Sequence, residues 1–74
     1  MNSFTIEAWI SGNVETLLVV PERHDGKKIY RIIKDGVELC TLKPNGTMGW
    51  EVNGTPLNAD ELERIGQQIK AFSN

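Results

Sequence analysis

The stretch KIYRIIKDGVELCTLK, residues 28–43, decides the fold. It contains two runs rich in apolar and β-branched residues, 28–34 and 37–43, on either side of Asp35-Gly36. Aspartate and glycine both tolerate a positive φ, and a two-residue type I′ turn requires a positive φ at its two central positions. The stretch therefore predicts a β-hairpin of two antiparallel strands.

Two more strands are predicted before this hairpin. Residues 4–10, FTIEAWI, alternate between apolar and polar, which is typical of a strand with one buried face. The turn-forming residues 11–13, Ser-Gly-Asn, separate them from a second apolar run at 14–20, VETLLVV. Pro21 cannot donate to a ladder and predicts the end of that strand. The polar segment 21–27 is then a connection with Asp25-Gly26 at its tip.

A fifth strand is predicted after the hairpin. Pro44-Asn45-Gly46 turns the chain, and TMGWEV, residues 47–52, follows with Met48, Trp50 and Val52 on one face. Gly49 on the other face predicts a bulge or the close approach of another backbone.

The C-terminal region predicts a helix that begins after Asn58. Asn58 is a favoured N-cap, and Glu61 stands three residues later, as a capping box requires. Leu57 and Leu62 have the spacing of a hydrophobic staple. Gly66 lies beside the apolar stripe, where it predicts close packing of the helix on the sheet, because a glycine inside a helix costs about 1 kcal/mol relative to alanine. The stripe itself has helical spacing and consists of Leu62, Ile65, Ile69 and Phe72.

The order of these elements predicts the fold class. Five strands followed by one helix, joined by short connections, indicate one α+β domain over residues 1–74. We expect an antiparallel, mostly meander-like sheet of about five strands, with the C-terminal helix packed on one face. The long-range strand order stays open, because two pairings fit the same pattern.

Alternation along the strands divides the apolar residues between two faces of the sheet. A one-residue slip within 14–20 would exchange Leu17 and Val19 with Leu18 and Val20. The face beneath the helix is predicted to hold Phe4, Ile6, Ile10, Leu18, Val20, Tyr30, Ile32, Val37, Leu39, Met48, Trp50 and Val52. The uncovered face is predicted to hold Trp9, Leu17, Val19, Ile29, Ile33, Cys40 and Leu42, with polar neighbours that include Arg31.

An uncovered face this apolar has three explanations. The sheet curls so that both sets become partly internal, two copies pack face to face, or the face receives a partner or ligand. Trp9 is the most informative residue, since tryptophan is favoured in interface hot spots. The predicted partner-binding residues are Trp9, Leu17, Val19, Arg31, Ile33 and Leu42.

Composition argues against several classes of protein. The chain has 74 residues and a net charge of −2, from 8 basic and 10 acidic residues. No basic stripe of the kind that binds nucleic acid is visible. No apolar run approaches the roughly 20 residues that span a bilayer. With no secretory signal and a single cysteine, we expect a cytoplasmic protein without a membrane anchor.

The residues with reactive side chains are few. His24 next to Asp25 fits a solvated loop, and Cys40 within a strand fits a small buried residue. The acidic residues at the helix start are explained by capping and the helix dipole. One cysteine and one histidine do not make a structural zinc site. We therefore expect no catalytic residues, no metal and no cofactor.

One pattern covers residues 28–72, which are Lys28, Ile29 and the stretch YRIIKDGVELCTLKPNGTMGWEVNGTPLNADELERIGQQIKAF. A hairpin with a central Asp-Gly precedes a tryptophan-containing strand and a short helix that contains Ile-Gly. The pattern is similar to that of small bacterial proteins of unknown function. The resemblance implies a β-meander followed by a C-terminal helix, and no functional residues.

These observations favour a non-enzymatic small domain. It would act by self-association, as a homodimer, or by binding a protein partner through the apolar sheet face. The alternative is a small-molecule binder with a pocket between a curled sheet and the helix.

Overall fold

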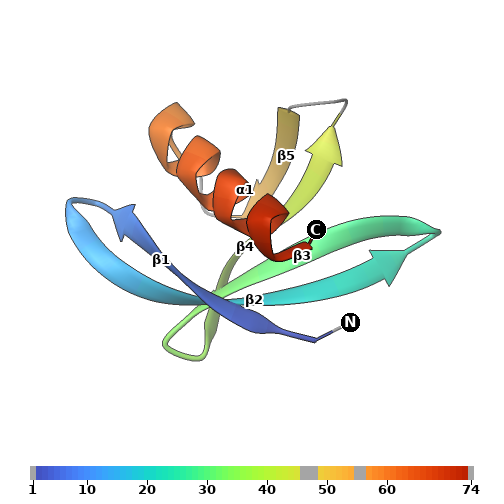
Figure 1. The fold of residues 1–74 in the computed structure, drawn as a ribbon, viewed down its shortest axis with the longest axis horizontal. Helices are drawn as coiled ribbons and strands as arrows, with labels where there is room; N and C mark the ends of the chain where they lie inside the picture. Colours follow the sequence, from blue (N-terminus) through green and yellow to red (C-terminus); the bar gives the residue numbers. More distant parts are fainter. Residues whose placement is uncertain (1, 46–48, 55–56, 74) are drawn as a thin grey trace.

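The computed structural model describes residues 2–45, 49–54 and 57–73, and they form one sheet and one helix. The five strands lie in the order β1-β2-β3-β4-β5, each antiparallel to its neighbour, and the sheet does not close (Figure 1). The predicted α+β meander is therefore confirmed. The elements are β1 Phe4–Ile10, β2 Asn13–His24, β3 Lys27–Lys34, β4 Val37–Asn45, β5 Gly49–Gly54 and α1 Ala59–Ser73.

Three of the strand connections are two-residue turns with positive φ at both positions. At Asp35-Gly36 the φ angles are 52° and 79°, which confirms the predicted hairpin turn. At Asp25-Gly26 and Ser11-Gly12 both φ angles are also positive. Short turns of this kind hold consecutive strands next to each other and explain the meander.

The second strand extends beyond its predicted end at Pro21. β2 continues to His24, and Pro21 lies opposite Tyr30 of β3. β1 pairs with β2 only as far as the pair Phe4–Val19, so Pro21 lies where β2 has no strand on its β1 side. A missing N–H is tolerated at such an edge, and the strand continues.

The fifth strand confirms the prediction for Gly49 and shifts the start of the strand. β5 begins at Gly49, and a side chain there would place its Cβ 2.7 Å from the carbonyl oxygen of Asn45. Only glycine permits this approach of two backbones. The predicted turn residue Gly46 and the predicted strand residue Met48 lie outside the described residues.

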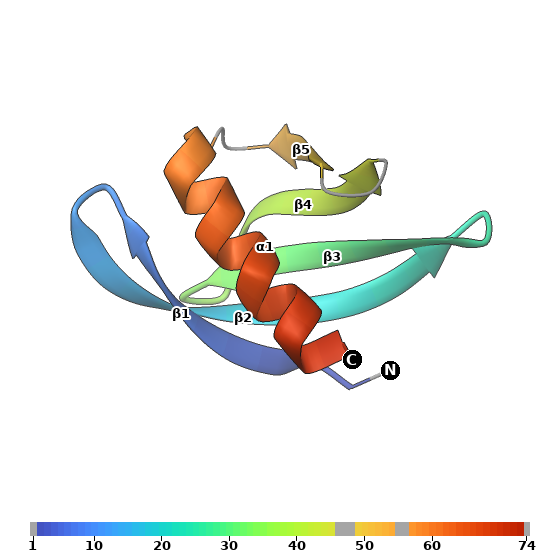
Figure 2. The ribbon, with the colours of Figure 1, turned by 45° about the horizontal axis from the view of Figure 1, so that its top comes forward.

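The helix begins as the capping pattern predicts. The Asn58 N–H donates to Glu61 Oε1 over 3.0 Å, and the Glu61 N–H donates to Asn58 Oδ1 over 2.8 Å. These two bonds form the reciprocal capping box. α1 then crosses one side of the twisted sheet (Figure 2). Ile65 and Ile69 are fully buried against the strands, in line with the predicted apolar stripe.

Gly66 confirms the predicted close contact between helix and sheet. It is buried, and a Cβ there would overlap Nε1 of Trp50 and lie 2.9 Å from its Cε2. The loss of helix propensity at this position is therefore offset by packing of the helix backbone against the indole ring.

The face assignment within β2 is wrong by one residue. Leu17 pairs with Ile6 of β1, and Val19 pairs with Ile32 of β3. Paired residues point to the same side of a sheet, so Leu17 and Val19 lie beneath α1 and are fully buried. Leu18, which was predicted to be covered, is 37% exposed on the other side.

The assignment within β4 is wrong because of a bulge. Along β3 the register passes from the pair Ile33–Glu38 to the pair Ile32–Cys40, so Leu39 is an extra residue. An extra residue reverses the alternation along the rest of a strand. Cys40 and Leu42 therefore belong to the covered face, where both are buried, and Val37 before the bulge is 64% exposed.

Candidate binding surfaces

The predicted partner-binding residues do not form one surface. Leu17, Val19 and Leu42 are 0% exposed and belong to the core beneath α1. The face turned away from α1, here called the outer face, retains Trp9, Arg31 and Ile33. Trp9 is exposed at the end of β1 and lies opposite Val14, which is also exposed. Leu18 and Val20 pair with Ile33 and Arg31 of β3, so they lie on the outer face in place of Leu17 and Val19. The apolar residues of this face are therefore not the predicted set.

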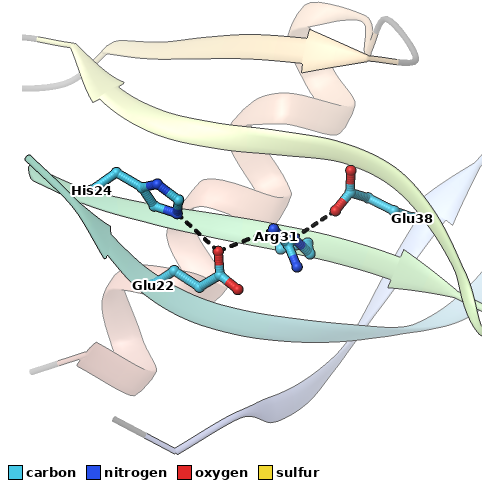
Figure 3. Close-up of polar contacts among 4 residues, drawn as sticks. All are labelled: Glu22, His24, Arg31 and Glu38. Atoms are coloured by element: carbon cyan, nitrogen blue, oxygen red, sulfur yellow. Dashed lines mark hydrogen bonds and ion pairs between the residues drawn. The ribbon is translucent and has the colours of Figure 1, made fainter.

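A row of charged side chains crosses the middle of the outer face (Figure 3). The Arg31 guanidinium on β3 lies 3.1 Å from Glu22 of β2 and 2.5 Å from Glu38 of β4. His24 Nε2 lies 3.1 Å from the same Glu22 oxygen. Exposed ion pairs contribute little stability, about 0–1 kcal/mol each. They do make this part of the outer face polar.

The reactive side chains do not converge. His24 contacts Glu22, two residues away, in an exposed position, and no hydrogen bond to Asp25 is seen in the described part of the chain. Cys40 is buried, and burial, followed by the charge of Glu38, raises the pKa of its thiol. A neutral, buried thiol is a poor nucleophile. Among the described residues, no group of three or more His, Cys, Asp or Glu side chains could hold a metal ion.

The acidic residue Glu61 has a second structural role in addition to the helix cap. Its Oε2 accepts a hydrogen bond from the Ser11 N–H over 3.2 Å, while its Oε1 serves Asn58. One carboxylate thus joins the start of α1 to the turn between β1 and β2. A shallow hollow of about 190 Å³ lies here, between Trp9, Gly12 and the first turns of the helix.

The helix closes the β1 edge of the sheet at two further points. The Gln68 side-chain amide donates to the carbonyl oxygen of Glu7 over 2.6 Å, so α1 satisfies a main-chain acceptor of β1. The rings of Phe4 and Phe72 stack with their centroids 4.6 Å apart. Covering an edge in this way is one of the means by which proteins prevent unwanted strand pairing.

The β5 edge differs from the β1 edge in its contacts with the helix, and the hollow beside it is the larger of the two described here. β5 is the last strand of the sheet, and within residues 49–54 and 57–73 no hydrogen bond joins it to α1. A groove of about 320 Å³ lies between this strand and the helix, here called the β5 groove. Its lining includes Trp50, Leu62, Glu63, Gly66, Gln67 and Lys70.

Trp50 forms the floor of the β5 groove. The ring is half-buried, and it meets Tyr30 edge to face at a centroid distance of 5.9 Å. Lys70 Nζ lies 5.9 Å from the centroid of the same ring. The sequence predicted Trp50 only as a core residue. The signal for a groove was the pair Gly49 and Gly66, since both line it and neither has a side chain to fill it. Gly66 lets the helix backbone approach the Trp50 ring.

Comparison with family models, curated proteins and solved structures found no match. The resemblance of residues 28–72 to small bacterial proteins therefore stays a prediction. The described residues contain no helix with the length and hydropathy needed to cross a membrane.

Proposed function

We propose that this chain is a non-enzymatic binding domain that receives an extended protein segment along the free edge of β5. The observation that carries the proposal is the contrast between the two edges of one sheet. α1 is hydrogen-bonded to the β1 edge, whereas the β5 edge borders a groove with an aromatic floor. Addition of a strand to a sheet edge beside a groove is a recurring mode of peptide recognition.

The direction of the main-chain groups of β5 supports the proposal. Trp50 lies opposite Pro44, which has no N–H. We therefore expect the pair Pro44–Trp50 to be the non-hydrogen-bonded kind, with the N–H and C=O of Trp50 pointing away from β4. Groups alternate along a strand, so those of Val52 point the same way. The N–H and C=O groups of Trp50 and Val52 would then be oriented to form hydrogen bonds with an added strand.

The β5 groove supplies side-chain recognition next to that edge. The side chains of Trp50 and Val52 point toward the α1 side of the sheet, as do alternate residues of a strand added beside them. An apolar side chain of the added strand would then cover the Trp50 ring and the small surface of Gly66. Glu63 and Lys70 flank this position with opposite charges.

A second candidate is a small-molecule binder, the alternative that the sequence suggested. The volume of the β5 groove, about 320 Å³, favours it. This value is near the lower end of ligand pockets, which are about 300–1,000 Å³. The free strand edge alongside is what favours a protein segment over a compact ligand.

The experiment is a selection of linear peptides from a random library on the immobilised full chain, at a low protein concentration. The affinity of the selected peptides is then compared between the wild type, Val52→Pro and Trp9→Ser. Val52→Pro removes an edge-facing N–H without removing a bond to β4, so we expect at least about a tenfold loss of affinity. Trp9→Ser, on the outer face, should leave affinity unchanged.

A further variant distinguishes loss of the binding site from local unfolding of β5, which Val52→Pro could also cause. Ala59→Trp fills the β5 groove from the exposed first turn of the helix and leaves the strand untouched. It should weaken the same peptides. Peptides that lose affinity with Trp9→Ser and keep it with both groove variants would place binding on the outer face and contradict the proposal. Compounds that bind the groove without protecting the Val52 amide would favour the second candidate.

A further inference from the structure

We infer that the strand added at β5 is β5 of a second copy of this chain, so that two sheets join into one continuous sheet. The inference rests on the proposed function and names the partner. It is carried by the self-complementarity of the edge: in a two-fold interface, whatever one copy presents must fit the same patch on the other copy.

The register of the edge strands is the first argument. Antiparallel pairing about a two-fold axis at Val52 places Trp50 opposite Gly54 of the second copy. Trp50, Val52 and Gly54 share the alternation that points main-chain groups to the free edge, so all three would form ladder hydrogen bonds. The largest side chain of β5 then faces a residue without one, and Glu51 faces Asn53 of the second copy.

The neighbouring register is disfavoured. An axis at Glu51 would place two carboxylates directly opposite each other in a close, non-hydrogen-bonded pair. Like charges at opposing positions destabilise a strand pair. The charge of Glu51 therefore favours the register centred on Val52 over the one centred on Glu51.

The charges of the helix are the second argument, and they come from a different element. A two-fold axis perpendicular to the sheet leaves both helices on one face, antiparallel to each other. Glu63 and Lys70 lie on either side of Gly66 and Gln67 in the lining of the β5 groove. We expect a two-fold image of this face to set Glu63 of each copy on the side of Lys70 of the other. The groove is thus complementary in charge to its own image.

The size of the chain gives a reason for such an interface. A domain of 74 residues buries a smaller share of its surface than a larger one, and it has no disulfide, since Cys40 is the only cysteine. Small domains are commonly stabilised by oligomerisation. Pairing at β5 would cover the open edge and half-buried Trp50 together.

The test is a charge exchange, measured as the dissociation constant of the dimer by light scattering over a concentration series. Glu63→Lys and Lys70→Glu each bring like charges together across the axis, and each should weaken association by about tenfold or more. The double variant Glu63→Lys/Lys70→Glu restores opposite charges and should return to within about threefold of the wild type. Both side chains are exposed, and circular dichroism confirms that each variant is folded.

Other outcomes would overturn the inference. A wild-type chain that stays monomeric throughout the series contradicts it, as does a dimer that neither single reversal weakens. So does a double variant that associates no better than the single ones. If a monomeric chain still binds library peptides in a Val52-dependent manner, the proposed function stands and only the identity of the partner is wrong. If neither occurs, both proposals fail.

Discussion

The two outer strands of the sheet, β1 and β5, end the same meander but have different surroundings. Gln68 donates to the main chain of β1, Glu61 holds the turn that follows it, and Phe72 stacks on Phe4. At β5, the helix contributes Gly66, whose backbone packs on Trp50 and leaves a groove beside the strand.

The difference shows what one helix can do for a five-stranded sheet. Its apolar stripe buries the middle of one face, and within the described residues its side-chain hydrogen bond to a strand goes to β1 and not to β5. Free edges are a hazard for aggregation unless they are blocked or used. We therefore propose a structural role for the β1 edge and a binding role for the β5 edge.

The largest predicted effect tests the layer beneath the helix, on which closure of the β1 edge depends. Leu17→Ala removes a fully buried side chain next to β1 and should lower the free energy of unfolding by about 3 kcal/mol. Leu18→Ala, one residue along, should change it by no more than about 0.5 kcal/mol. Urea unfolding of the two variants decides between the faces, and equal losses would contradict the register described here.

The next effect concerns the contact that shapes the β5 groove. Gly66→Leu places a Cβ within the van der Waals radius of the Trp50 ring and should destabilise the fold by about 2 kcal/mol. Ala71→Leu, at an exposed position of the same helix, is the matched control and should be close to neutral. An unchanged melting temperature for Gly66→Leu would refute the close contact.

A smaller effect is expected at the carboxylate that joins α1 to the β1–β2 turn. Glu61→Ala removes the acceptor of two main-chain N–H groups and should lower stability by about 1.5 kcal/mol. Asp60→Ala removes an equal charge from the same helical turn but leaves both hydrogen bonds of Glu61 in place, so its effect should be smaller. The measurement is the melting temperature of both variants. Equal decreases would assign the effect to the helix dipole alone.

The smallest effect belongs to the aromatic stack at the far end of the β1 edge. Phe72→Ala, Phe4→Ala and the double variant form a thermodynamic cycle, and we expect a coupling energy of about 1 kcal/mol. The rings are partly exposed, so each single loss should be modest. A coupling energy near zero would show that the stack does not hold the helix end to β1.

Much of the fold could be predicted from local sequence, since the decisive signals are local. Asp35-Gly36 fixes a turn by its backbone preferences, and Asn58 with Glu61 fixes a helix start by two hydrogen bonds. Gly49 and Gly66 predicted close approaches of the backbone to neighbouring groups, and the structure confirms both.

The predicted surface depended on distant pairing, and there the sequence was insufficient. Alternation within 14–20 fits either face until β1 and β3 fix the register of Leu17. The bulge at Leu39 then reverses the faces of Cys40 and Leu42, and no residue in that run signals an extra position. The β5 groove depends on the angle at which α1 crosses the strands, which the helix sequence does not specify.

Amide hydrogen exchange of β1 and β5, measured residue by residue in dilute and concentrated solution, tests the contrast between the two edges most directly. We expect the Trp50 and Val52 amides to exchange rapidly in dilute solution and to become protected as the protein concentration rises, while the exchange of the Phe4–Ile10 amides is unaffected. Protection that grows along β1 instead, or Trp50 and Val52 amides already protected in the dilute monomer, would contradict an open binding edge at β5.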